Sequence, residues 1–254
     1  MERILNCIPS RDTERDWSLA AAVEAGVIED GDPPPSVDLR APWWTIRDQG
    51  STGACVGFAA ADGVLRRMYV DAGWIEETEF TSPRFIWMAD KETDRYWEYP
   101  TSFLESEGTY IKQALSVART YGCVLEKDLP MKGRRSKLTL ESFYTRAARL
   151  RIATYHRLGN DPDAWRRWLA FGGPVLTRLM VDETFLDASE TGGELSRYRP
   201  STVIGGHAVS LVGYTKKGFI VRNSWGTEWG DGGYAHASNS YAKAAFDEAY
   251  GAVL

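Results

Sequence analysis

The amino-acid sequence predicts an α+β fold made of two lobes. Before about Leu150, apolar residues recur at steps of three and four, which is typical of amphipathic helices. After that point most apolar residues fall in short, β-branched runs between glycine or charged turns, which is typical of strands. The 254 residues, 43% of them hydrophobic and 26% charged, provide enough apolar material for a sizeable core. A helical half followed by a β-rich half favours two lobes facing one cleft.

The chain divides into three segments. Residues 1–34 form an N-terminal extension, called here the lead segment, which is charged at first and ends in the proline cluster Pro33–Pro35. We expect one helix in it, over Trp17–Ala25, and either a short inhibitory prosegment or a passive tail. Residues 35–149 form the helical lobe and residues 150–254 the β-rich lobe.

Four further helices are expected. One begins at Cys55 and carries Phe58, Ala59, Leu65, Met68 and Tyr69 on one face, so Cys55 lies in its first turn. Another begins with Ser82 as N-cap and Pro83 at the first helical position. A third extends from about Thr109 to Gly122, and a fourth from Asp161-Pro162 to Gly172.

Strands are expected at Pro174–Met180, Ala208–Tyr214 and Gly218–Arg222. No internal repeat or low-complexity tract interrupts these elements.

Charge and composition exclude several classes of partner. The net charge of −5 with dispersed basic residues argues against nucleic acid and anionic membranes as partners. No run of about 18 apolar residues predicts a membrane span, and the charged amino terminus lacks the apolar core of a secretory signal. We therefore expect a cytoplasmic protein.

The cysteines, Cys7, Cys55 and Cys123, are odd in number and far apart, so a disulfide framework is not expected. They form no CxxC pair, and His156, His207 and His236 do not cluster with them in the sequence, so no metal site is expected. Calcium, zinc and nucleotide motifs are absent from the sequence, and we expect no cofactor. The question is what a free thiol does.

Three short segments carry chemistry-bearing residues. Residues 49–58 place two glycines before Cys55, so that a tight loop delivers the thiol to the start of a helix, where the helix dipole favours a thiolate. Residues 205–214 place His207 at the start of a strand. Residues 223–234 form a turn rich in glycine and tryptophan that begins with Asn223.

At these segments the chain resembles the papain-like cysteine peptidases, the family of papain and the cathepsins. The stretch Thr52–Val56 corresponds to the family's cysteine signature, with His and Asn far downstream in the family's order. Pro35–Arg40 looks like the start of the family domain, and Glu107-Gly108 leads into the third helix as in the family. Thr52 departs from the family's disulfide-forming cysteine, and Val56 from its usual aromatic residue.

The resemblance implies a papain-like fold, with a helical left lobe, a β-barrel-like right lobe and the active-site cleft between them. We expect an intracellular member without disulfides, from a prokaryotic or viral source.

By matching position, the resemblance implies Cys55 as the nucleophile and His207 as its proton partner, in a thiolate–imidazolium resting pair. Asn223 would hold the other ring nitrogen of His207, and Trp225 would shield that bond from water. Gln49 would donate its side-chain amide to the oxyanion, together with the backbone N–H of Cys55.

The family's dominant specificity pocket would lie around Arg178, Gly205 and Gly206, although a shift of one residue would bring Thr177 or Leu179 there instead. If Arg178 enters this pocket, an acidic side chain two positions before the scissile bond would be preferred. Protein or peptide substrates are expected, while the oligomeric state stays open.

The resulting prediction is a cysteine endopeptidase that acts through a Cys-His-Asn triad and an acyl-enzyme intermediate. The alternatives are a catalytically silent binding module of peptidase fold and an acyl-transfer enzyme such as a peptide ligase, cyclase or amidase. Cys123 is expected in the core, and His156 and His236 in structural or surface positions.

Overall fold

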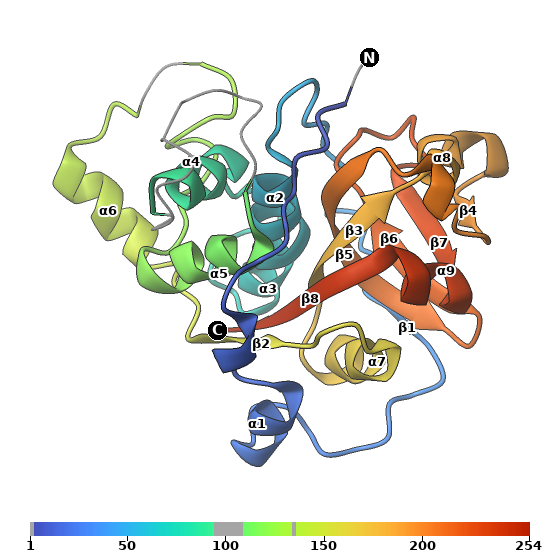
Figure 1. The fold of residues 1–254 in the computed structure, drawn as a ribbon. Coiled ribbons are helices and arrows are strands. Elements are labelled where there is room, and N and C mark those ends of the chain that lie inside the picture. Colours follow the sequence, from blue (N-terminus) through green and yellow to red (C-terminus); the bar gives the residue numbers. More distant parts are fainter. Residues whose placement is uncertain (1–2, 94–108, 134–135) are drawn as a thin grey trace.

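Figure 1 shows a computed structural model that describes residues 3–93, 109–133 and 136–254. The helices of residues 55–148 gather on one side, and a large sheet with the helices of residues 162–245 lies on the other, in agreement with the α+β fold expected from the sequence. The α-helices are α1 (Leu19–Glu24), α2 (Cys55–Gly57), α3 (Arg66–Asp71), α4 (Pro83–Thr93), α5 (Ile111–Thr120), α6 (Leu140–Ala148), α7 (Pro162–Phe171), α8 (Glu183–Leu186) and α9 (Asn239–Ala245). The π-helical stretch η2 (Phe58–Leu65) joins α2 to α3, and short 3₁₀ turns are η1 (Thr13–Arg15), η3 (Ala188–Thr191) and η4 (Pro200–Thr202).

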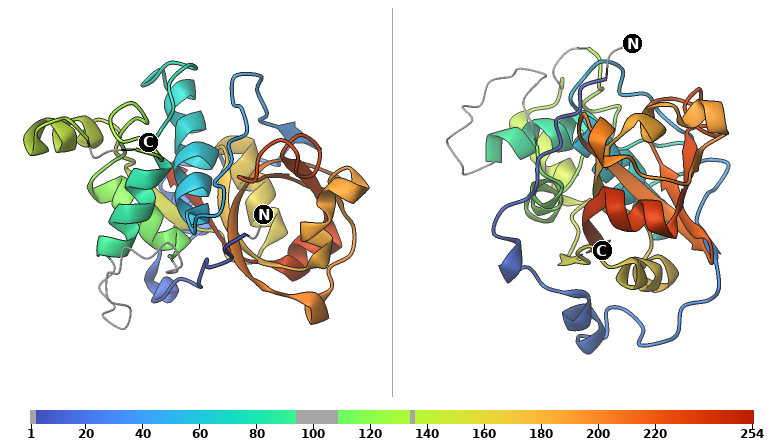
Figure 2. Two further views of the ribbon diagram at one scale, coloured as in Figure 1. Left: turned by 90° about the horizontal axis from the view of Figure 1, so that it is seen from above. Right: turned by 45° about the vertical axis from the view of Figure 1, so that its right-hand side comes forward.

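The strands are β1 (Val37–Asp38), β2 (Thr154–Arg157), β3 (Val175–Val181), β4 (Glu194–Leu195), β5 (Gly205–Thr215), β6 (Gly218–Arg222), β7 (Tyr234–Ser238) and β8 (Phe246–Val253). They form one sheet in the order β2-β8-β3-β5-β6-β7-β4, with β1 added beside β5. Neighbouring strands are antiparallel except β4 and β7. The sheet curves round its lobe (Figure 2, left), but within the described residues no pairing joins β2 to β4. The lobe expected to be barrel-like is therefore an open sheet.

A helix begins at Cys55, as the sequence predicts, and continues through η2 and α3 to Asp71. The π-helical form of its middle was not predicted. Every residue of η2 is buried, because this helix lies between α4 and the sheet. Two glycines permit the close packing: a Cβ at Gly57 would lie 2.4 Å from the carbonyl oxygen of Pro83, and one at Gly63 would lie 2.3 Å from Ser210 Oγ.

The helix starts read from the sequence are largely confirmed. Ser82 Oγ accepts the N–H of Phe85 at 3.1 Å, which caps α4. Asp161 caps α7 directly before Pro162. The expected helix from Thr109 begins at Ile111, because Thr109 pairs with Cys7 of the lead segment. The motif Glu107-Gly108 lies outside the described residues.

Within the described residues, two large apolar cores stabilise the lobes. One lies between the sheet, α7 and α9, and includes the two fully buried indoles Trp165 and Trp168. The other surrounds the helix of Cys55 and α5, and also receives Leu176 and Ala208 from the sheet. In the described part of the chain, no helix is long and apolar enough to cross a membrane.

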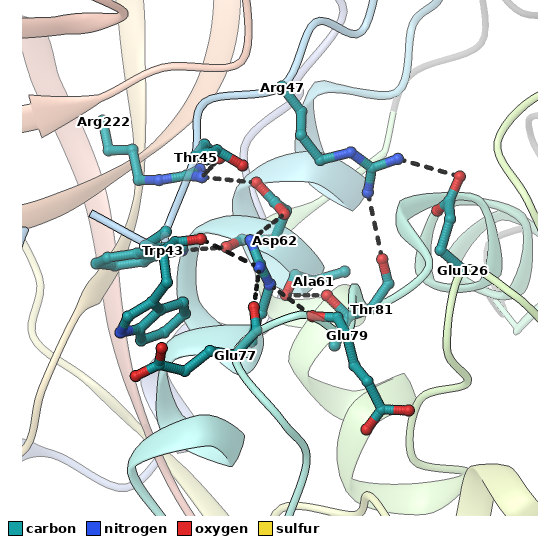
Figure 3. Close-up of polar contacts among 12 residues, drawn as sticks. Trp43, Thr45, Arg47, Ala61, Asp62, Glu77, Glu79, Thr81, Glu126 and Arg222 are labelled. Atoms are coloured by element: carbon teal, nitrogen blue, oxygen red, sulfur yellow. Dashed lines mark hydrogen bonds and ion pairs between the residues drawn. The ribbon is translucent and has the colours of Figure 1, made fainter. Parts of the chain in front are cut away.

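A buried charge network ties the helix of Cys55 to the sheet (Figure 3). Asp62 Oδ2 lies 2.7 Å from Arg222 Nη2, and Asp62 Oδ1 lies 3.8 Å from Arg66 Nη1. All three side chains are at most 2% exposed. Arg66 also donates to the carbonyl oxygens of Glu77 and Glu79, both at 2.8 Å. Since Arg222 ends β6, this network fixes the helix against the strand that leads to Asn223.

Candidate active site

The β5–β6 hairpin brings His207 and Asn223 together. Ser210 of β5 pairs with Arg222, the last residue of β6, in antiparallel register. His207 lies three residues before Ser210, so it comes beside the residues that directly follow Arg222. The two-residue turn at Lys216 and Lys217 closes the hairpin with Thr215 opposite Gly218, and an irregularity between Leu211 and Gly213 then shifts the register by one residue, which places Ser210 opposite Arg222.

The contact between the two side chains is direct. His207 Nε2 donates to Asn223 Oδ1 at 2.8 Å, and both residues are buried. The Trp225 ring lies 4.7 Å from the imidazole, centroid to centroid, and is itself only 4% exposed. His207 Nδ1 has no hydrogen-bond partner in the described part of the chain. The bond therefore fixes the orientation of the imidazole, the Trp225 ring lies against it, and Nδ1 is the ring nitrogen that could exchange a proton.

Cys55 is the first residue of α2, and α2 packs against β5, which carries His207. The first N–H groups of a helix have no partner within the helix, so the backbone N–H of Cys55 is suited to stabilise an oxyanion. Cys55 Sγ lies 3.9 Å from Oδ1 of Asn6 in the lead segment. The thiol has no exposed surface.

Gln49 is held by the turn that follows Asn223. Its Oε1 accepts from the hydroxyl of Ser224 at 2.7 Å, and its Nε2 donates to the carbonyl oxygen of Thr52 at 2.9 Å. The Ser224 N–H donates to Asn223 Oδ1 at 2.8 Å. Ser224 thus connects the amide expected in the oxyanion site with the partner of His207.

The lead segment runs along the junction of the two lobes (Figure 1, dark blue). The N–H of Cys7 donates to the carbonyl oxygen of Gly206 at 3.0 Å, and the N–H of Ile8 donates to that of Thr109 at 3.1 Å. A Cβ at Gly206 would lie 2.0 Å from the carbonyl oxygen of Cys7, and one at Gly205 would lie 2.7 Å from that of Leu5. The two glycines therefore allow this backbone to approach.

The buried setting keeps His207 uncharged. Burial lowers the pKa of His207 from 6.5 to about 4, against the opposing effect of the Asn223 hydrogen bond, and the positive charge of Arg3 lowers it further. The imidazole is thus neutral at pH 7 in the covered chain, that is, while the lead segment lies over Cys55. This differs from the expected thiolate–imidazolium pair, which requires a charged imidazole.

Arg178 reaches the lead segment, where its Nε donates to the carbonyl oxygen of Cys7 at 2.9 Å. Its guanidinium also forms an ion pair with Asp247. Since a carboxylate already neutralises Arg178, the arrangement does not favour the expected preference for acidic side chains. Of the alternatives, Thr177 is buried with its hydroxyl on the carbonyl oxygen of Glu248, and Leu179 is buried in the core of the β-rich lobe.

The other two cysteines are poor nucleophiles. Burial raises the pKa of Cys123 to about 12 and that of Cys7 well above its usual value. All three thiols are free of disulfides. Cys123 is fully buried in the helical lobe, as expected.

The remaining histidines lie outside the site. His156 is buried between the rings of Trp17 and Trp168, whereas His236 lies on β7. Within the described residues, no group of three or more His, Cys, Asp or Glu side chains could hold a metal ion.

Sequence reasoning missed three residues around the site. Ser224 stands between Asn223 and Trp225 in the sequence, and its position in that turn was the available signal. Asp48 precedes Gln49 and binds Arg3, as described below. Glu248 accepts the N–H of Ser10 from the lead segment at 3.0 Å, but nothing in the sequence near Glu248 indicates that contact.

Comparisons with known proteins give the relatives of the chain. Residues 33–250 match the family described as papain family cysteine protease. The chain is 28% identical over 210 residues to an uncharacterised peptidase C1-like protein of Acanthamoeba polyphaga mimivirus, covering 76% of this chain and 64% of that protein. It is 26% identical over 248 residues to the cathepsin B-like CP3 of Giardia intestinalis, covering 84% and 72%. The chain thus spans just under two thirds of the viral relative.

Solved structures share the fold. Xylellain, a cysteine protease from Xylella fastidiosa, superposes with a TM-score of 0.78 at 23% identity, covering 100% of this chain and 97% of that one. The procathepsin B S9 of Trypanosoma congolense gives a TM-score of 0.72 at 17% identity, covering 99% and 86%. At these identities the superpositions show a common fold.

Proposed function

The chain belongs to the papain family of cysteine proteases, and from this premise we propose that it is a cysteine endopeptidase acting on proteins or peptides. Cys55 is the nucleophile, His207 the proton carrier, Asn223 the residue that orients His207, and Gln49 an oxyanion donor. The observation that carries the proposal is the buried 2.8 Å bond from His207 Nε2 to Asn223 Oδ1, which leaves Nδ1 for a proton.

The reaction has two stages. His207 Nδ1 takes the proton of Cys55, and the sulfur attacks the peptide carbonyl carbon, so that an oxyanion forms beside Gln49 and the Cys55 N–H. The C–N bond then breaks, His207 gives its proton to the leaving amine, and an acyl thioester remains on Cys55. In the second stage His207 takes a proton from water, the hydroxide displaces the thiolate, and a carboxylic acid is released.

Alkylation tests the assignment of the nucleophile. Iodoacetamide followed by peptide mapping should label Cys55 before Cys7 and Cys123, whose pKa values are raised by burial. Cys55→Ala should abolish peptide hydrolysis, whereas the control Cys123→Ala should retain it. Labelling of Cys123 with Cys55 untouched would refute the assignment. Adding an amine nucleophile to the assay distinguishes hydrolysis from acyl transfer, because a ligase diverts the acyl-enzyme to the amine.

The lead segment is proposed to restrain this activity. It lies over Cys55 and is anchored beyond the site, where Asp16 Oδ1 contacts Lys112 Nζ at 2.7 Å and Asp16 Oδ2 accepts from the Tyr250 hydroxyl at 2.6 Å. Its withdrawal would admit water to His207, and rehydration raises the pKa of a buried histidine towards its usual value. The thiolate–imidazolium pair would thereby become accessible.

Two variants test this restraint. Deletion of residues 1–34 should raise both the rate of Cys55 alkylation and peptide hydrolysis. Because the deletion also removes the buried Cys7, the full-chain variant Lys112→Met is the milder test, since it removes the ion pair to Asp16 and two hydrogen bonds to lead-segment carbonyl oxygens. Unchanged rates in both variants, with the fold intact, would identify the segment as a passive tail.

The cytoplasm remains the proposed location. Three buried cysteines that form no disulfide suit a reducing compartment.

A further inference from the structure

The side chain of Arg3, in the lead segment, occupies a site made by two turns of the catalytic region. Its Nη1 donates to Asp48 Oδ1 at 2.6 Å and to the carbonyl oxygen of Gly50 at 2.9 Å. Its Nη2 donates to the carbonyl oxygen of Trp225 at 3.1 Å. The guanidinium carbon lies 5.5 Å from the centroid of the Trp225 ring. One carboxylate, two carbonyl oxygens and an indole thus surround a single cation.

The chemistry of this site fits a guanidinium group. A guanidinium presents several N–H donors in one plane, accepts no hydrogen bond, and stacks on aromatic rings. The site offers three acceptors in different directions and an aromatic face. A planar guanidinium can contact all of them at once, whereas the compact ammonium of a lysine matches this arrangement less well. Burial acts to raise the pKa of the Asp48 carboxyl, but the hydrogen bonds from Arg3 and the Gly50 N–H together lower it, so the carboxylate form is favoured.

The walls of the site are held by main-chain pairing and do not depend on Arg3. Asp48 and Trp225 form an antiparallel bridge. The N–H of Gln49 donates to the carbonyl oxygen of Ser224 at 2.9 Å, and that of Gly226 to the carbonyl oxygen of Arg47 at 3.2 Å. These backbone bonds keep the acceptors in place when the lead segment leaves, so the site would persist in the uncovered enzyme.

The position of the Arg3 site indicates on which side of the scissile bond it lies. Asp48 precedes the oxyanion donor Gln49, and Trp225 lies on His207, so the Arg3 site adjoins the proton carrier. Four residues further along the lead segment, Cys7 binds Gly206, at the specificity pocket that the family resemblance places on the acyl side. The Arg3 site lies at the other end of this path, on the side from which the amine leaves.

We propose that Asp48, Trp225 and the carbonyl oxygen of Gly50 form a guanidinium-binding subsite that selects substrates with arginine on the leaving-group side of the scissile bond. Arg3 occupies this subsite while the lead segment lies over Cys55. The selectivity rests on the proposed peptidase function, whereas guanidinium binding does not.

The first experiment measures selectivity with the full-chain Arg3→Ala protein, in which only this part of the lead segment is removed. Internally quenched peptides are compared that carry arginine or citrulline, its uncharged analogue, at the first or second residue after the scissile bond. Mass spectrometry locates the cleavage. We expect kcat/KM to be at least threefold higher for an arginine peptide than for its citrulline partner, and Asp48→Asn to remove that ratio.

Asp38→Asn is the matched control. Asp38 also binds an arginine, Arg40, at 2.7 Å, and its side chain is 47% exposed, the same fraction as Asp48. This variant should keep the ratio. Equal kcat/KM for arginine and citrulline peptides at both positions, or a ratio that survives Asp48→Asn, would overturn the proposed selectivity.

The second experiment needs no catalysis. In full-chain Arg3→Ala, Cys55→Ala protein, arginine amide should shift the indole N–H resonance of Trp225 in a saturable, millimolar titration, and citrulline amide should not. Adding Asp48→Asn should abolish the shift. Equal responses to the two amides would overturn the subsite. If neither this chain with Cys55 restored nor the chain without residues 1–34 cleaves a peptide, the endopeptidase proposal fails, while this titration still decides whether the subsite exists.

Discussion

Replacing Ser224 by alanine should weaken oxyanion stabilisation without altering the nucleophile. The Ser224 hydroxyl donates to Gln49 Oε1 at 2.7 Å, and the two residues are 5% and 3% exposed. Its removal leaves a buried acceptor unsatisfied, at a cost of about 1–3 kcal/mol, and the Gln49 amide can relieve that cost by turning away. Loss of a whole oxyanion donor costs about 2.7–4 kcal/mol in the barrier.

For Ser224→Ala, the expected increase in the activation free energy is smaller than the cost of losing a whole oxyanion donor. Gln49 Nε2 still donates to the carbonyl oxygen of Thr52, so the amide is loosened and not released. We expect kcat/KM to fall by about 10- to 100-fold, equivalent to about 1.4–2.7 kcal/mol. Ser224→Thr, which keeps a hydroxyl, should recover part of the loss. Ser224→Ala combined with Gln49→Ala should be no slower than Gln49→Ala alone, because both changes act on one donor.

Two rates separate this role from a general structural one. Peptide hydrolysis forms an oxyanion, whereas alkylation of Cys55 by iodoacetamide does not, so Ser224→Ala should slow the first and leave the second unchanged at each pH. Ser210→Ala is the control, because it removes another buried hydroxyl, one without a hydrogen-bond partner in the described part of the chain. If alkylation slows in proportion to hydrolysis, or hydrolysis is unaffected, the positioning role is refuted.

Three further predictions concern charge and burial. The free energy of unfolding should fall by about 2.6 kcal/mol between pH 6.5 and pH 4 through His207 alone, because its pKa of about 4 in the folded chain makes the unfolded chain bind the proton more tightly in this range. His207→Gln should remove this part of the slope in urea titrations. Asp62→Ala should destabilise the fold by about 3–5 kcal/mol, because it leaves Arg66 and Arg222 buried without their carboxylate; an unchanged denaturant midpoint would contradict this. Cys123 should resist iodoacetamide at pH 8 until the chain unfolds, and labelling of the native protein would show that its thiol is accessible.

The elements that position the proposed triad could be predicted because their signals are local. Ser82 and Pro83 mark a helix start whatever surrounds them, and the cap at Ser82 forms as expected. The runs Ala208–Tyr214 and Gly218–Arg222 are separated by a short charged turn, which predicts a hairpin. Antiparallel pairing then brings His207 near Asn223.

Other features depend on contacts between distant residues, which local patterns do not contain. The spacing could place Arg178 near the pocket, but it could not show that Arg178 forms an ion pair with Asp247 of β8, which lies far along the chain. The helix α6 was missed, and one of its apolar residues, Leu140, is 76% exposed, so its pattern of apolar residues marks no clear buried face. The π-helical turn at Phe58–Leu65 follows from dense packing around Gly57 and Gly63, which apolar periodicity does not describe.

The path of the lead segment is the clearest limit of pattern reading, and its physical basis explains why. Near Cys55 the segment is held by its backbone, through the N–H groups of Cys7 and Ile8, and any sequence without proline there could form those bonds. Only its anchoring side chains are specific, among them Arg3 on Asp48 and Asp16 on Lys112. In the sequence, two charged residues that anchor the segment look the same as charged residues of a tail exposed to solvent. A segment bound in this way is therefore recognised through its partners, above all through the glycine at 206, where any side chain would meet the carbonyl oxygen of Cys7.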